Sequence, residues 1–192
     1  MEIAGGSTPK TSVDSYWEQG SHHWATPKDL SRLTSPILID TQRKITDSGL
    51  KSIGNRLYPK GTLLLSSRAP IGYLSMTDIP TAVNQGMIAV LPGGRLSPFY
   101  MIAWAKENMV KIKNMANGST FSEISKANFR KIKTIAPDEK IIKKYDSLSK
   151  SLYDMITLNS RQNSLLQTLR DELLPKLMSG RIRVPLEGAY GK

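Results

Sequence analysis

The chain has 192 residues, of which 39% are hydrophobic, and carries 27 Lys and Arg against 16 Asp and Glu, a net charge of +11. This length suits one ordinary domain plus an extension, and the hydrophobic content allows a packed core rather than a disordered chain. No apolar run approaches the roughly 20 residues that a membrane helix needs, and the start shows no signal peptide. Cysteine is absent, which excludes disulfides and thiolate metal sites and leads us to expect a cytoplasmic protein.

Positive charge is concentrated in the first part of the chain. Residues 1–137 contain 17 Lys and Arg and 9 Asp and Glu, a net charge of +8, and the Lys and Arg are densest in "KENMVKIKNM" and "KANFRKIKT". A basic surface of this kind favours nucleic acid as the partner. Acidic membrane lipid is less favoured because no basic amphipathic helix with large apolar anchors stands out. A surface of merely solvated lysines is the alternative.

Short apolar runs bounded by Gly, Pro and Asn predict strands at 62–66, 73–77 and 86–92. A helix is predicted from 97 onward, because Ser97 can cap it and Pro98 suits its first position. "GST" at 118–120 predicts a loop. Ser125 is then expected to cap a short helix that runs into a strand.

The pattern changes at Pro137, after which no glycine or proline occurs until Leu174, and Asp138 is a plausible N-cap. Apolar residues recur with a heptad period, which predicts a helix about 55 Å long with a coiled-coil seam and a polar middle. The predicted seam residues are Tyr145, Leu148, Leu152, Met155, Asn159, Gln162, Leu166, Leu169 and Leu173. We expect this helix to bend or stop near Pro175, with Gly180 as a terminator. A helix of this length is not expected to fold back on so small a core, so it needs a partner helix.

These elements predict an α+β protein in three parts. A β-rich globular domain occupies 1–137, a long coiled-coil-forming helix occupies 138–178, and a tail occupies 179–192.

Several enzyme motifs do not fit the sequence. "GGSTPKT" lacks the spacing of a phosphate-binding loop. The adjacent His22 and His23 diverge on any regular element, which disfavours a shared metal. There is no nucleophile elbow, methyl-donor loop, Asn-Pro-Pro-aromatic tetrad or clear acidic cluster for magnesium. The sequence therefore shows no catalytic machinery.

Seven segments lie in an order that is familiar from a known family: "GGSTPKT", "YWEQGSHHWATPKDL", "DTQRKITDSGL", "LYPKGTLLLSSRAPIGYL", "AVNQG", "NGSTFSEISKANFRKI" and "LLQTLRDELLPKLMSGRIRV". Together they resemble one half of the specificity subunit of type I restriction-modification systems, namely one target recognition domain and one conserved spacer helix. Members of that family usually have two of each in a pseudo-twofold arrangement. This chain has one of each, so it is either a natural half-subunit or a fragment. "TIAPDEKII" departs from the family's usual proline-rich entry to the helix.

The resemblance implies a non-enzymatic subunit that reads one part of a bipartite site in double-stranded DNA. The helix would pair antiparallel with a second helix, in a homodimer if this is a half-subunit, and would set the spacing between half-sites. It would also dock the modification (methyltransferase) subunits, and a restriction subunit would join them. S-adenosylmethionine, ATP and Mg would serve those partners, and no cofactor is expected in this chain. The C-terminal end of the helix is the segment expected to dock the methyltransferase, through Arg170 and Leu177; the alternative is that it packs on the recognition domain of the paired chain.

Ser66, Ser67 and Arg68 recur in relatives that read different DNA sequences, so they cannot be the main source of discrimination. Arg68 is expected to hold a phosphate or a structural carboxylate, and the serines to satisfy loop backbone groups. The same argument covers Asn84 and Gln85. Base reading is expected from polar side chains in 32–60 and 106–120. The candidate DNA-contacting residues are Lys28, Arg43, Lys44, Arg56, Arg68, Lys111, Lys113, Asn117, Ser119, Thr120 and Lys126.

Two other classes of function stay open at this point. The chain could be a fragment of a DNA methyltransferase or nuclease, although the missing catalytic motifs argue against it. It could instead be an assembly adaptor whose basic domain does not read sequence.

Overall fold

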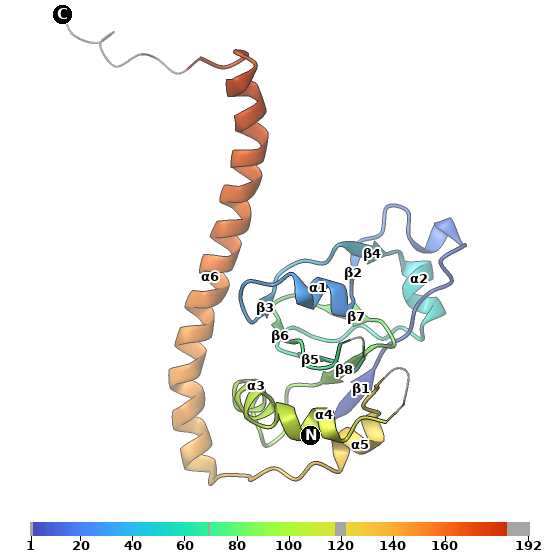
Figure 1. Ribbon diagram of the computed structural model, residues 1–192, viewed down its shortest axis with the longest axis vertical. Coiled ribbons are helices and arrows are strands. Elements are labelled where there is room, and N and C mark those ends of the chain that lie inside the picture. Colours follow the sequence, from blue (N-terminus) through green and yellow to red (C-terminus); the bar gives the residue numbers. More distant parts are fainter. Residues whose placement is uncertain (1, 69, 118–121, 184–192) are drawn as a thin grey trace, which may run out of the picture. The chain divides into compact units, whose positions relative to one another are not determined.

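The computed structural model describes residues 2–68, 70–117 and 122–183, and its α+β architecture confirms the predicted fold class (Figure 1). The chain divides into two compact units, Met1–Thr157 and Leu158–Lys192. Among the described residues, no helix is both long and apolar enough to cross a membrane. The predicted division of roles between 1–137, 138–178 and 179–192 concerns function and stays a prediction; residues 184–192 of that tail lie outside the described ranges.

The first unit contains two small sheets. The larger has the order β1-β8-β5-β6-β3, formed by β1 (Ile3–Gly5), β8 (Met87–Val90), β5 (Leu63–Ser66), β6 (Leu74–Thr77) and β3 (Ile37–Leu38). Its pairs are antiparallel except β3 with β6. The smaller has the order β4-β2-β7, formed by β4 (Arg43–Ile45), β2 (His22–Ala25) and β7 (Thr81–Val83). The three strands predicted at 62–66, 73–77 and 86–92 coincide with β5, β6 and β8.

The continuous apolar run in β5 arises because both faces of the larger sheet are covered. Leu63 and Leu65 pack into a core with Met101, Ile112 and Phe129, and these come from α3 (Pro98–Glu107), α4 (Met109–Asn114) and α5 (Lys126–Arg130). Leu64 points to the opposite face, where it packs with residues of both sheets. Successive side chains of a strand alternate between faces, so a strand buried on both sides reads as "LLL". Figure 1 shows these helices on one side of the larger sheet and β2, β4 and β7 on the other.

Four helices begin at predicted or recognisable caps. Thr26 caps α1 (Pro27–Ser31) in a capping box, Thr46 caps α2 (Asp47–Ser52), Ser97 caps α3 and Ser125 caps α5. In each case the hydroxyl accepts from an amide in the first turn, which satisfies a donor that the helix leaves unpaired. A single turn of 3-10 helix, η1, covers Asp14–Tyr16.

Two local predictions were wrong. The helix expected from Ser97 is broken into α3 and α4 at Asn108, whose side-chain amide donates to the carbonyl of Trp104. The strand expected after α5 is not formed, because 133–138 has no sheet neighbour. Instead Ile132 is buried in the core, Ile135 is exposed, and the hydroxyl of Tyr100 donates to the carbonyl of Ile135 at 2.8 Å.

The long helix, α6, runs from Glu139 to Met178, and Asp138 caps it by accepting from the amide of Lys140 at 2.8 Å. The helix ends near Pro175, as expected, although it does not stop at the proline itself. Proline removes only one amide donor there, and the helix ends three residues later, where Gly180 adopts a φ of 71° and donates to the carbonyl of Leu177.

The first half of α6 also packs against its own domain, which corrects the expectation that the helix stands clear of the core. Ile142 and Ser149 are buried, the side chain of Asp146 accepts a hydrogen bond from Ser97, and the ring of Tyr153 meets that of Phe99. This contact uses one face of the helix, and most of the predicted seam lies beside it.

Candidate nucleic-acid interface

The tip of the β5–β6 hairpin is built around two buried serines. The hydroxyl of Ser66 accepts from the amides of Gly72 and Tyr73 at 3.0 and 2.8 Å and donates to the carbonyl of Pro70 at 2.8 Å. Ser67 is buried, and its amide donates to the carbonyl of Gly86. The Ser66 hydroxyl therefore satisfies loop backbone groups, as the sequence indicated, and for the Ser67 hydroxyl this role stays a prediction.

Arg68, beside these serines, faces a carboxylate of its own chain. Its guanidinium lies 3.8 Å from the side chain of Glu123, and the two residues also form an isolated β-bridge. Gly86 packs closely on the arginine, since a Cβ added at Gly86 would lie 3.2 Å from its Nε. This geometry supports the structural-carboxylate role for Arg68, and a phosphate contact by the same side chain stays a prediction.

The "GGSTPKT" segment packs against the "VNQG" segment, so motifs far apart in sequence meet in space. The amide of Ser7 donates to the carbonyl of Val83 at 3.0 Å, and the hydroxyl of Thr8 is hydrogen-bonded to the side chain of Gln85. Gly6 allows this close approach, because a Cβ there would fall 1.7 Å from the carbonyl oxygen of Val83. These segments are therefore needed for the fold of the domain.

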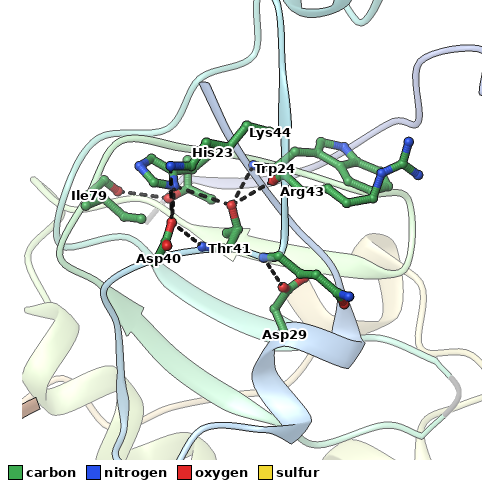
Figure 2. A network of polar contacts seen from close by, with 10 residues as sticks. His23, Trp24, Asp29, Asp40, Thr41, Arg43, Lys44 and Ile79 are labelled. Atoms are coloured by element: carbon green, nitrogen blue, oxygen red, sulfur yellow. Dashed lines mark hydrogen bonds and ion pairs between the residues drawn. The ribbon is translucent and has the colours of Figure 1, made fainter. Parts of the chain in front are cut away.

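A second polar cluster lies at β4, an edge strand of the smaller sheet, with members from β2 and from the residues just before β4 (Figure 2). Asp40 pairs with the ring of His23 at 3.1 Å and with the ammonium of Lys44 at 3.5 Å. The hydroxyl of Thr41 donates to the carbonyl of Arg43 at 2.8 Å and accepts from the amide of Trp24 at 3.3 Å. Consecutive residues of this edge are thus held by short contacts, while Arg43 and Lys44 stay exposed.

Two tryptophans support Arg43. Its guanidinium carbon lies 3.5 Å from the ring centroid of Trp17 and 5.8 Å from that of Trp24. Cation–π contacts of this kind favour arginine held flat against the ring. The sequence predicted Arg43 as a DNA contact but gave no role to Trp17. The sequence feature that could have indicated one is the pair of tryptophans flanking "EQGSHH".

The predicted DNA-contacting residues fall into separate places. Arg68 and Asn117 both bridge to Glu123, while Lys113 and Lys126 lie against Gly72 and Gly5. Arg43 and Lys44 form the cluster on β4. The remaining described candidates are Lys28 on α1, Arg56 in the loop after α2, and Lys111 on α4, all exposed. Ser119 and Thr120 lie outside the described residues. Glu123, which sequence reasoning missed, is what joins Arg68 to Asn117.

The predicted docking residues lie in the second unit. Arg170 pairs with the neighbouring Asp171 at 2.7 Å, and Leu177 is partly exposed. The docking role is not tested by this geometry and stays a prediction.

The two histidines are each paired with a carboxylate, and they do not share a site. Burial, reinforced by the charge of Lys44, lowers the pKa of His23 below its ordinary value, and Asp40 opposes this shift. A hydrogen bond from His22, at 2.6 Å, lowers the pKa of the exposed Asp47. Among the described residues there is no group of three or more His, Cys, Asp or Glu side chains placed to hold a metal ion.

The chain thus combines a basic α+β domain with a long helix, and comparison with known proteins identifies the family that has this architecture. The sequence model of a family described as "Type I restriction modification DNA specificity domain" matches residues 1–168. The chain belongs to this family.

Two curated relatives illustrate the match. The chain is 33% identical over 174 residues to the type I restriction enzyme MjaIX specificity subunit of Methanocaldococcus jannaschii, covering 90% of this chain and 40% of that protein. It is 28% identical over 149 residues to the type I restriction enzyme HindI specificity subunit of Haemophilus influenzae, covering 76% and 32% respectively. The chain therefore spans well under half the length of these relatives.

Solved structures show the same fold at low sequence identity. The HsdS subunit from Thermoanaerobacter tengcongensis matches with a TM-score of 0.57 and 18% identity, over 91% of this chain and 41% of that chain. The S subunit of a type I restriction-modification system from M. genitalium matches with a TM-score of 0.60 and 13% identity, over 93% and 43%.

Proposed function

We propose that this chain is a non-catalytic DNA-recognition component of a type I restriction-modification complex, and that its globular domain reads one part of a bipartite site. The observation that carries the proposal is the family match over residues 1–168. The net charge of +8 on residues 1–137 supports it, because a basic surface gathers DNA phosphates and makes affinity depend on salt.

In this proposal α6 pairs antiparallel with a second helix and fixes the distance between two recognition domains. Support comes from the exposed seam: Leu148 is 72% exposed, and Leu152 and Met155 are each 61% exposed. In a symmetric antiparallel pair Asn159 and Gln162 meet near the middle, where polar side chains can satisfy each other and set the register.

The methyltransferase subunits would dock on the helix and its neighbouring surface, with Arg170 and Leu177 as the contacts we favour, and a restriction subunit would join the complex. S-adenosylmethionine, ATP and Mg would serve those subunits. Titrating methyltransferase subunits onto the chain and onto Arg170→Ala and Leu177→Ala variants tests the docking role, with sedimentation reporting whether pairing is retained.

A selection from random DNA duplexes tests the recognition role. The chain is expected to enrich a short defined sequence, and to bind that duplex with an affinity that falls steeply with salt. An assembly adaptor would instead bind matched and unmatched duplexes equally, and that result would overturn the proposal. Arg68→Ala serves as an internal comparison, because loss of a shared structural contact should weaken binding about equally on all sequences.

A further inference from the structure

Trp17 and Trp24 form a rigid platform on the surface of the smaller sheet. Their rings meet edge to face, with centroids 5.0 Å apart and an interplanar angle of 82°. The indole N–H of Trp17 donates to the carbonyl of Lys10, and that of Trp24 donates to the carbonyl of Ser7, both at 3.1 Å. Because both indole donors are already used and Trp24 is buried, the two rings are fixed before any ligand arrives.

Arg43 is held on this platform by its backbone as well as its side chain. In the antiparallel pairing of β2 with β4 it lies directly opposite Trp24, and the hydroxyl of Thr41 fixes its carbonyl. The stacked guanidinium uses only its face, which leaves its N–H donors along the edge. Within the described part of the chain, these donors make no hydrogen bond or ion pair.

The contrast with Arg68 shows what is unusual about this arginine. Arg68 faces the carboxylate of Glu123, whereas the two acids that flank β4 in sequence are paired with other residues: Asp40 with His23 and Lys44, and Asp47 with His22. Arg43 is thus oriented by aromatic rings that do not neutralise its charge, on an exposed edge strand. Such a group is ready to accept an anion without first breaking an internal ion pair.

We propose that Arg43 binds a DNA backbone phosphate and that Trp17 is its positioning residue. The inference rests on the proposed function as a DNA-recognition component. A phosphate fits better than a base, because stacking keeps the guanidinium close against the protein surface. Base edges lie at the floor of a groove about 8.5 Å deep, whereas phosphates line its rim.

The test compares variants of the full chain on the selected duplex and on an unrelated duplex, over a range of salt concentrations. Arg43→Ala should weaken binding by a similar factor of about 3 to 10 on both duplexes and reduce the salt slope by about 1. Lys140→Ala, which removes one exposed charge from α6, is the matched control and should leave the affinity nearly unchanged.

Trp17 is tested by variants that keep the charge of the protein constant. Trp17→Leu preserves apolar packing but removes the ring face, and it should reproduce most of the loss seen in Arg43→Ala; Trp17→Phe should restore most of the affinity. Thermal midpoints of all variants are measured alongside. In the double variant the two losses should not add, because both act on one contact.

Three results would overturn the inference. Arg43→Ala could change the preference between duplexes, which would make it a base reader. Arg43→Ala could leave both the affinity and the salt slope unchanged, which would mean that Arg43 does not contact DNA. The loss of affinity caused by Trp17→Leu could persist in full in the Arg43→Ala background, which would mean that Trp17 acts only on the fold. These differ from failure of the proposed function, in which the unaltered chain itself would select no sequence.

Discussion

The first half of α6 carries two neighbouring stripes of residues, one buried against the domain and one exposed. The domain-facing stripe, made of Ile142, Asp146, Ser149 and Tyr153, is buried or bonded to the chain's own domain. The predicted seam lies beside it, and there Leu148, Leu152 and Met155 stay more than half exposed. Only Tyr145, the first seam residue, shares in the domain contact, because its ring meets Tyr100. A single helix thus uses one face for its own fold and leaves an apolar face without an intramolecular role, which is where a partner helix would bind.

The largest effect is expected from charging the seam. Leu152→Lys combined with Leu166→Lys places four lysines in the apolar parts of the seam on either side of the polar middle of a symmetric antiparallel pair, and should abolish self-association. Sedimentation at tens of micromolar measures this, with the unaltered chain expected to pair. The globular domain should keep its thermal midpoint, because both leucines are exposed in the single chain. A monomeric unaltered chain would remove the basis for assigning a role to the seam.

The domain-facing stripe should respond in the opposite way. Ile142→Ala empties a buried position and should lower the free energy of unfolding by about 2–4 kcal/mol, whereas Leu152→Ala in the single chain should change it by less than about 0.5 kcal/mol. Urea unfolding must be measured at dilutions where the chain is monomeric, because pairing would otherwise stabilise the seam. Equal costs for the two substitutions would mean that the stripes are not distinct.

These two stripes also show how far the sequence could lead. Heptad spacing predicted the helix and the seam, Asp138 after Pro137 predicted the cap, and short apolar runs bounded by Gly, Pro and Asn predicted β5, β6 and β8. The domain-facing stripe was missed because Asp146, Ser149 and Tyr153 are not an apolar pattern. Asp146 and Tyr153 are held by contacts with Ser97 and Phe99 at the start of α3, which spacing along one helix does not encode. The stacking of Arg43 on Trp17 was missed for the same reason, since it depends on η1 packing near β4.

A smaller effect is expected from the hydroxyl that joins α3 to the domain-facing stripe. Ser97 both caps α3, by accepting from the amide of Tyr100, and donates to Asp146. Ser97→Ala removes both bonds and should cost about 1–2 kcal/mol, in the upper part of the ~0.5–2 kcal/mol range for lost caps, because the bond to Asp146 is lost as well. Ser97→Thr, which retains a hydroxyl, should recover most of it. Self-association should not change, because the seam is untouched, and weaker pairing in Ser97→Ala would instead show that the domain contact helps to orient the seam.

The smallest expected effect is a pH dependence that should leave both stripes unaffected. Burial lowers the pKa of His23 in the folded state below the ordinary 6.5, with Lys44 acting in the same direction and Asp40 against it. Because the unfolded chain then takes up a proton more readily, stability should be complete well above pH 6.5 and should decrease as the pH falls through 6.5 toward the folded-state pKa.

Thermal midpoints of the chain and of His23→Gln between pH 8 and pH 5.5 measure the contribution of His23. The variant should lose less stability on acidification, while His22→Gln serves as the neighbouring control. The lowered pKa of Asp47 does not interfere, since a carboxylate with a depressed pKa contributes stability above its ordinary value of 3.8 and loses it only below this window. If the thermal midpoint of His23→Gln changed with pH as steeply as that of the unaltered chain, another group would be responsible for the pH dependence. No histidine lies in either stripe of α6. A change in self-association over the same pH range would therefore show that the region around His23 is coupled to the helix seam.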